Sequence, residues 1–392
     1  MMKRYLLLLP VLIIACGMPG LGQGCSQGGG VAQKRVPCRA DLHETALFLA
    51  GMPAESGDEA WIRLREDPVY AGHVAYMDRF WENVTRLTVV PVRAWRPGNL
   101  PAAYDREMVF YPLSGADFIN MYCLFPDAPF YLMVALEPPG DAPALAAMGR
   151  QGIASLLYSM QTAIPEFGMM NYFMSHIMQN AMTGTQLAGV APVIMAFMAR
   201  LGLRVCGVER IGFDDEGRPV ATGTVESAPA QKNNAPAASG VRISFNVPGE
   251  TEHRTLVYLC AKLDDGFARG GSPEGRYVGS FRSYVTMLKS AIFFMHYDWI
   301  GAVRAMVLDR SLMIVQDDSG IPYRFFDRTV WDVRLLGIYD PSYTLTNATV
   351  LPQPDMRAAY PRDNAPLPFH YGYGVIINKS NMQIAVKKKT TR

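Results

Sequence analysis

The chain has 392 residues, of which 49% are hydrophobic and only 18% carry a charge. This composition argues against a disordered chain, a coiled coil and a broad basic surface for nucleic acid. The formal net charge of +2 belongs to the two ends of the chain, because basic residues cluster in a predicted leader and in the last six residues. The body is close to neutral and long enough to bury a large core.

The first residues have the pattern of an export signal. Lys3 and Arg4 precede a run of ten apolar residues, 5–14. This run is too short for a stable membrane anchor. Residues 1–15 are therefore predicted to be a signal peptide.

The end of this leader, Ile-Ile-Ala-Cys at 13–16, resembles a bacterial lipobox, in which the cysteine receives a lipid. We therefore predict lipidation of Cys16. The family typically has Asp at the next position for retention in the inner membrane, and Gly17 stands there instead. The resemblance thus implies an outer-membrane anchor that faces the periplasm. The alternative is cleavage after the small-x-small site at residues 20–22, which would release a soluble periplasmic or secreted protein.

Five further cysteines follow Cys16. Residues 16–39 are rich in Gly, Gln and Ser and predict a flexible tether. Cys25 and Cys38 lie in and at the end of this tether and are a possible disulfide pair. The odd number argues against a disulfide framework. The remaining cysteines lie in apolar contexts, where a reduced Cys packs as a small hydrophobic residue: Cys123, Cys206 and Cys260.

The body predicts an α+β fold with two related strand-helix-helix-strand halves. Apolar spacing predicts a helical collar over residues 40–100. The first α/β repeat is expected at 101–226 and the second at 241–392, with a linker rich in Ala, Pro and Asn at 227–240. The second repeat is expected to close on a β-hairpin over residues 369–386.

Similar patterns in the same order suggest that the halves arose by internal duplication. A predicted strand at 131–136 matches one at 258–263. The apolar spacing at 153–164 matches that at 281–292, and both predict a buried helix face. Each half then has a turn of the form Asp-Asp-x-Gly-x-Pro, at Asp214 and at Asp317. The alternative is that α/β proteins repeat this order of elements without duplication.

Catalytic signatures are weak. There is no H-E-x-x-H, C-x-x-C or phosphate-binding glycine loop, and the G-x-S-x-G match at 24–28 has neither strand nor helix beside it. Ser114 and Asp117 follow an aromatic strand and are candidates for a nucleophile and a carboxylate. The Asp-Asp turns are candidates for acid–base chemistry. A tight turn explains both patterns without catalysis, and we favour that interpretation.

Four methionines recur at intervals of four residues, at Met170, Met174, Met178 and Met182, with His176 among them. On one helix these thioethers would share a face and suit a soft metal such as Cu(I). Methionine also fills irregular core space, and the chain contains 23 of them. We favour the core interpretation and predict no metal or other cofactor.

Several segments resemble a family of exported bacterial proteins without a characterised role. They are Tyr-Pro-Leu-Ser-Gly-Ala-Asp-Phe at 111–118, Phe-Pro-Asp-Ala at 125–128, Leu-Glu-Pro at 136–138, Gln-Asp-Asp-Ser-Gly-Ile-Pro at 316–322 and Gly-Tyr-Gly at 372–374. The likeness extends over most of residues 45–386. It implies export and one architecture, but no activity, ligand or catalytic residue. The chain departs from the family at 375–377, where Val-Ile-Ile replaces basic and aromatic residues.

These patterns together predict an envelope lipoprotein that acts as a non-catalytic binding or interaction module. Its expected partners are the membrane, through the lipid anchor, and an envelope protein or a small ligand, but not nucleic acid. The alternative is an envelope hydrolase that uses Ser114 or the Asp-Asp turns.

Overall fold

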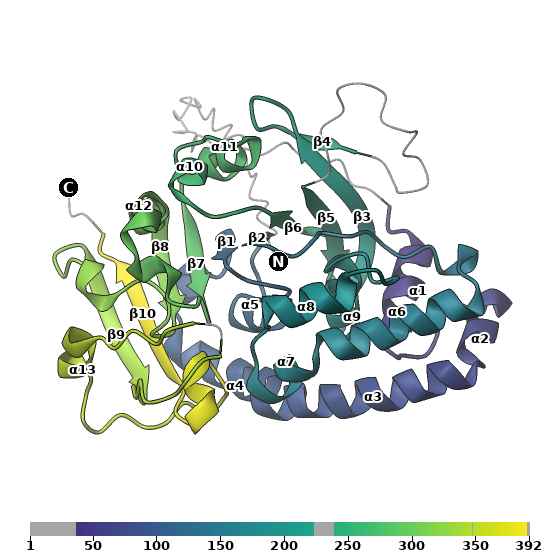
Figure 1. Cartoon of the computed structure of the whole chain (residues 1–392), viewed down its shortest axis with the longest axis horizontal. Helices are drawn as coiled ribbons and strands as arrows, with labels where there is room; N and C mark the ends of the chain where they lie inside the picture. Colours follow the sequence, from purple (N-terminus) through teal and green to yellow (C-terminus); the bar gives the residue numbers. More distant parts are fainter. Residues whose placement is uncertain (1–36, 223–238, 347, 390–392) are drawn as a thin grey trace, which may run out of the picture. The chain divides into compact units, whose positions relative to one another are not determined.

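The computed structural model describes residues 37–222, 239–346 and 348–389. The leader, Cys16 and Cys25 lie outside these residues, and so does most of the predicted linker. The described residues form a mixed sheet with helices, which confirms the α+β class (Figure 1). In the described part of the chain no helix is both long and apolar enough to cross a membrane.

Ten strands form one sheet within the described residues, in the order β4-β3-β5-β6-β2-β1-β7-β8-β10-β9. The neighbours β6, β2, β1, β7 and β8 are parallel, and antiparallel strands extend the sheet at both edges. The strands are β1 (Val109–Pro112), β2 (Phe130–Ala135), β3 (Arg204–Phe213), β4 (Pro219–Ala221), β5 (Gly240–Asn246), β6 (Arg254–Cys260), β7 (Tyr284–Leu288), β8 (Ser311–Gln316), β9 (Trp331–Gly337) and β10 (Asn381–Lys387).

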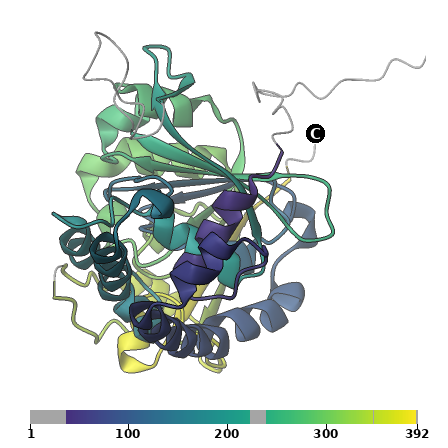
Figure 2. The same cartoon turned by 90° about the vertical axis from the view of Figure 1, so that its right-hand side faces the viewer.

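Helices cover both faces of this sheet, as Figure 2 shows. Every residue of β1 and β7 is buried, as expected for parallel strands between two helical layers. One face packs against α1 (Ala40–Leu49), α3 (Pro68–Val84), α5 (Phe118–Leu124), α6 (Arg150–Ala163), α7 (Pro165–Met170), α8 (Ser175–Met182) and α9 (Ala191–Arg200). The other packs against α10 (Asp265–Ala268), α11 (Pro273–Ser280) and α12 (Gly301–Arg310).

Helices occupy most of residues 40–99, where the sequence predicts them. Besides α1 and α3, these are α2 (Glu59–Arg65), the π-helix η1 (Thr85–Val89) and α4 (Val90–Asn99). They do not form a collar with its own core, because Phe48 of α1 and Phe80 of α3 belong to the same buried cluster as the sheet residues. This segment is therefore part of the helical layer on one face of the sheet.

The structure does not confirm the internal duplication. The predicted helix at 281–292 contains strand β7, whereas its counterpart at 153–164 lies mostly in α6. The two Asp-Asp turns also differ, since the first joins the antiparallel β3 and β4 and the second follows the parallel β8. A short, fully buried strand and a buried helix face are hard to distinguish by periodicity alone.

The predicted closing hairpin at 369–386 is also wrong. Residues 373–377 form the short 3-10 helix η8 (Tyr373–Ile377), and β10 pairs with β8 and β9 instead. Gly372 (φ 68°) permits this turn, because a Cβ there would lie within 2.4 Å of the Asp317 side chain. Between β9 and β10 the chain also forms α13 (Pro354–Ala359).

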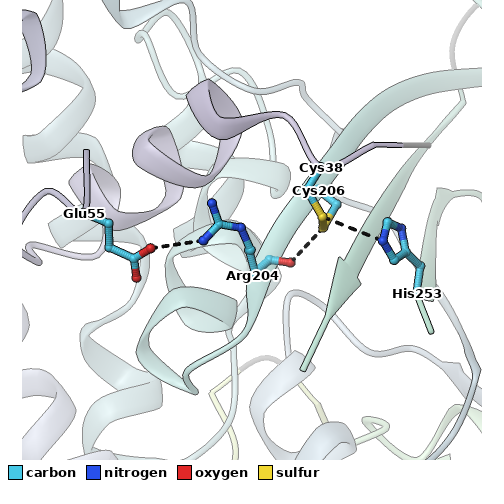
Figure 3. Close-up of a disulfide and its surroundings, with 5 residues drawn as sticks. All are labelled: Cys38, Glu55, Arg204, Cys206 and His253. Atoms are coloured by element: carbon cyan, nitrogen blue, oxygen red, sulfur yellow. Dashed lines mark hydrogen bonds and ion pairs between the residues drawn. A yellow bond between two sulfur atoms is a disulfide. The ribbon is translucent and has the colours of Figure 1, made fainter. Parts of the chain in front are cut away.

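Cys38 pairs with Cys206, not with Cys25. The structure joins Cys38, just before α1, to Cys206 on β3 over a sequence separation of 168 residues (Figure 3). Cys206 lies where the register of β3 shifts against β5. The expectation of a reduced Cys206 was wrong because its partner is remote in sequence. Among the described cysteines, Cys123 and Cys260 are free.

Candidate functional site

A cavity of about 740 Å³ lies at the carboxyl ends of β1, β2 and β7. Most of its walls are apolar or aromatic: Leu113, Leu136, Met170, Tyr172, Phe173, Met174, Ile292, Phe294, Leu345, Tyr373 and Ile376. The polar or charged lining residues include Ser114, Asp117, Ser175, His176, Gln179, Lys289, Ser290, Thr344 and Thr346. This size and mixture are typical of small-molecule sites.

The topology of the sheet explains the position of the cavity. Numbered among themselves in chain order, the five parallel strands lie in the spatial order 3-2-1-4-5, which is that of doubly wound sheets. The chain leaves β1 toward β2 on one side and later returns to β7 on the other side. Loops diverge at this switch point, and the crevice between them is the usual ligand site of such sheets.

The turn between β1 and α5 forms one wall. Leu113 (φ 61°) and Gly115 (φ 55°) both have left-handed backbone conformations on either side of Ser114. Gly115 fits closely, because a Cβ there would lie 3.2 Å from the Cβ of Phe173. Asp117 then caps α5 by accepting a hydrogen bond from the backbone N–H of Asn120. The turn is thus fixed against the opposite cavity wall.

Lys289 forms a buried ion pair in this site. It follows directly after β7, and its Nζ donates to Oδ2 of Asp117 at 2.8 Å and to the carbonyl oxygen of Asn171. The side chains of Lys289 and Asp117 are 1% and 2% exposed. The hydroxyl of Tyr111 also donates to Asp117 Oδ2 at 3.1 Å. Among the described residues two of the three ammonium protons have hydrogen-bond acceptors, which leaves one for a ligand. The centre of the Phe167 ring lies 5.8 Å from the Nζ atom.

An asparagine pair joins the two walls behind this ion pair. Asn120 of α5 and Asn171, which follows α7, exchange side-chain hydrogen bonds of 2.7 and 3.0 Å. Asn171 has a left-handed backbone (φ 59°) and also donates to the carbonyl oxygen of His370. These bonds hold Asn171 in place, and its carbonyl oxygen accepts a hydrogen bond from Lys289.

The predicted methionine stripe does not lie on one helix. Helix α7 ends at Met170, the chain turns, and α8 begins at Ser175. Met170 and Met174 line the cavity together with His176, whereas Met178 is fully buried in the core. The turn at Asn171 interrupts the helical spacing on which the stripe depended. The methionines therefore serve partly as cavity wall and partly as core.

The two Asp-Asp turns have different environments. Asp214 lies in the β3–β4 hairpin and caps the turn by accepting backbone bonds from Glu216 and Arg218. Asp317 and Asp318 are buried behind the cavity. The first turn therefore has a local structural role, whereas the second is part of the support of the cavity.

Asp317 and Asp318 hold two segments that line the cavity. Asp317 accepts hydrogen bonds from the backbone N–H groups of Ser290 and Tyr373, both lining residues. Asp318 accepts one from the hydroxyl of Tyr343, which precedes the lining segment 344–346. Burial raises the pKa of both carboxyl groups, and for Asp318 burial together with the nearby Asp317 raises the pKa to about 7.

The raised pKa predicts that Asp318 makes the fold less stable as pH rises from about 4 to about 7. The folded state retains the proton over this range, whereas the unfolded state loses it near the ordinary pKa. Asp318→Asn imitates the neutral acid, because its amide can still pair with Tyr343 and Asn381. Between pH 4 and pH 7.5 we expect the free energy of unfolding of this variant to rise relative to that of wild type by more than about 1.4 kcal/mol, the equivalent of one pKa unit.

Urea unfolding of both proteins at each pH measures this difference. The comparison is needed because burial lowers the pKa of His73 and His296 to about 4, which gives wild type an opposite slope below pH 6.5. Both proteins share that slope, so it cancels in the difference. A constant difference across the range would contradict the prediction for Asp318.

Of the residues predicted for catalysis, Ser114 and Asp117 line the cavity, whereas the carboxylates of the two Asp-Asp turns are not among its lining residues. Ser114 and His176 both line it, and Ser114 donates to the carbonyl oxygen of Gly115 at 3.1 Å. Asp117 is already engaged by Lys289 and by the cap of α5. Its position as a cap and ion-pair partner differs from that of the carboxylate that orients a catalytic histidine.

Lys289 was missed from the sequence, although a signal was present. It is the only charged residue between Tyr284 and Met295, within an otherwise largely apolar run. A lone cation in a buried segment needs a partner, because an unpaired buried charge is very costly. The partner, Asp117, is 172 positions away and could be identified only from the fold.

Comparisons with known proteins do not help to interpret this site. No family model, no curated protein and no solved structure matches the chain. The functional argument therefore depends on the geometry of the cavity and on the sequence.

Proposed function

We propose that the protein is a non-catalytic binding module of the bacterial envelope that holds a small organic ligand in the cavity between β1 and β7. The observation that carries the proposal is this cavity, placed at the switch point of a doubly wound sheet, with apolar walls and the buried Lys289–Asp117 pair. A signal-like leader and the lipobox at Cys16 support an anchored, exported form. The Cys38–Cys206 disulfide is consistent with an oxidising compartment.

The walls and the ion pair define the chemistry of the ligand. Lys289 and Asp117 neutralise each other, so the site favours a ligand without a full charge near them. The free proton of Lys289 requires a hydrogen-bond acceptor, such as a carbonyl or ether oxygen. Aromatic and thioether side chains, including Tyr172, Phe173 and Met174, suit an aromatic or aliphatic body.

Nucleotides are a poor fit, although the strand order is one that often binds them. The acidic cap Asp117 occupies the start of α5, where a phosphate would otherwise bind. Glu137, at the end of β2, lies where such sheets place an acid for a ribose. Here Glu137 is fully buried and accepts a bond from the hydroxyl of Tyr258 at 3.2 Å. Asp117 is thus engaged inside the fold, and Glu137 is buried, with its Oε1 lacking a hydrogen-bond partner among the described residues.

The neutral fluorescent probe N-phenyl-1-naphthylamine tests the cavity directly. We expect one probe per chain and a fluorescence increase on binding. Gln179→Trp, on an exposed position of α8 that lines the cavity, should weaken binding at least tenfold by filling the entrance. Asn180→Trp is the matched control, since it is exposed on the same helix but does not line the cavity.

Equal binding by wild type and both variants would place the probe elsewhere and contradict the proposal.

The second candidate function, a hydrolase, is favoured by one observation, the presence of Ser114 and His176 in the same cavity. It requires that a fluorophosphonate label Ser114 in wild type and that His176→Ala abolish this labelling. Absence of label on Ser114 would exclude a serine hydrolase mechanism.

A further inference from the structure

His253 joins the Cys38–Cys206 disulfide on the side of the molecule that carries β3 and β5. Its Nε2 lies 3.7 Å from Sγ of Cys38, and Figure 3 shows the ring directed at the sulfur atoms. One potential ligand atom from each of the three residues lies within 4.8 Å of the others. The cluster thus combines three segments that are far apart in sequence.

The fold holds Cys38 and Cys206 close together by contacts other than the bond between their sulfur atoms. Cys206 lies at the irregularity of β3 between Val205 and Gly207. The backbone N–H of Arg39 donates to the carbonyl oxygen of Cys206 at 3.1 Å. Helix α1 begins one residue later and is buried along most of its length. Reduction would therefore leave the two thiols as neighbours.

Two cysteine sulfurs and an imidazole are a donor set that Zn²⁺ uses in proteins, with a solvent molecule as fourth ligand. With Zn–S near 2.3 Å and Zn–N near 2.0–2.1 Å, a tetrahedral ion separates its sulfur and nitrogen ligands by about 3.5 Å. The present distance from Cys38 Sγ to His253 Nε2 is 3.7 Å. Little movement of the imidazole is needed to complete such a site.

The charges around the cluster also allow a cation. Nη2 of Arg39 lies 2.5 Å from Oδ2 of Asp41, and Nη1 of Arg204 lies 3.1 Å from Oε2 of Glu55. Each of these two guanidinium groups therefore has a carboxylate partner, which reduces its repulsion of a metal ion. Cys38 and His253 are partly exposed, so an ion can reach them from solvent.

We propose that Cys38, Cys206 and His253 form a redox-controlled Zn²⁺ site. The oxidised protein holds the disulfide and does not bind zinc there. A dithiol supplies two electrons and two protons to the disulfide, which gives two thiols and leaves the dithiol oxidised. Zn²⁺ then binds the two thiolates and the imidazole and displaces the two thiol protons into solvent. The disulfide and the metal thus fasten the start of α1 to β3 in alternative ways.

Zinc binding by the full chain tests the proposal. One sample is oxidised, and the other is reduced with a dithiol and then freed of metal and reductant under anaerobic conditions. We expect one tightly bound Zn²⁺ per reduced chain, measured by competition with a chromophoric chelator, and none in the oxidised protein. His253→Gln should weaken binding at least tenfold in the reduced state. Cys206→Ser should abolish it. Zinc should also raise the Tm of reduced wild type but not that of reduced His253→Gln.

Matched variants separate this site from other thiols. Cys260→Ser should bind zinc like wild type, because Cys260 does not belong to the cluster. Cys25→Ser should also bind zinc like wild type, because the proposed site needs no sulfur from Cys25. His253→Gln can form the disulfide, so an unchanged circular dichroism spectrum in the oxidised state confirms that it folds. Failure of reduced wild type to bind zinc, or equal binding by His253→Gln, would overturn the proposal. Loss of zinc binding in Cys25→Ser would assign the metal to the N-terminal segment instead.

Discussion

Replacing Lys289 with Met is expected to lower the free energy of unfolding by about 3–5 kcal/mol. The variant keeps most of the side-chain volume but removes the ammonium that faces Asp117 at 2.8 Å. Asp117, 1% exposed as a residue, would then be a buried carboxylate without its cation. Chemical denaturation followed by circular dichroism measures the loss.

The double variant Lys289→Met with Asp117→Asn is the control for this interpretation. Asparagine can still accept the capping bond from the backbone N–H of Asn120 but carries no charge. The loss of unfolding free energy in the double variant should therefore be smaller than the sum of the two single losses by at least about 1.5 kcal/mol, as expected for coupled residues. Additive losses would mean that the two residues contribute independently, and the buried pair would not explain the effect.

Cys206→Ser is expected to lower the free energy of unfolding of the oxidised protein by about 2–5 kcal/mol. The disulfide closes a loop with a sequence separation of 168 residues, so its removal greatly increases the freedom of the unfolded chain. Urea unfolding in the presence of a metal chelator measures the loss without a contribution from bound zinc.

The partner variant and a free cysteine provide the controls. Cys38→Ser should cost the same as Cys206→Ser, and the double variant should cost no more than either, because all three remove one bond. Cys260→Ser changes a half-buried free thiol and should have an effect below about 1 kcal/mol. A loss for Cys206→Ser that is absent in Cys38→Ser would reflect packing at β3 and not the disulfide.

The elements of the fold were predictable where one local pattern dominated. The spacing of Met77, Phe80 and Val84 marks a buried helix face, and all three are buried in α3. The prediction of a helix was wrong at Tyr284–Leu288, where a helical spacing of apolar residues coincides with a fully buried strand. Since both faces of a central parallel strand are buried, it has no alternation of apolar and polar residues to reveal it.

The candidate site was predictable only in part. Ser114 and Asp117 were identified because small and acidic residues follow an aromatic strand, and both do line the cavity. Their roles were not, because Asp117 is engaged by Lys289, which follows a strand that is adjacent in the sheet but remote in sequence. The same limit concealed Cys206 as the partner of Cys38.

The sequence by itself determined the class of elements and the near-neutral body, because these depend on composition and on neighbouring residues. The leader and the lipobox stay predictions from the sequence. Only the tertiary structure decided the order of the strands and hence which loops meet. That order places the end of β1 beside the end of β7, which creates the cavity and the Lys289–Asp117 pair. It also brings His253 to the two cysteines. The contacts of Lys289 with Asp117 and of Cys38 with His253 join residues more than a hundred positions apart, and no local pattern in a chain encodes them.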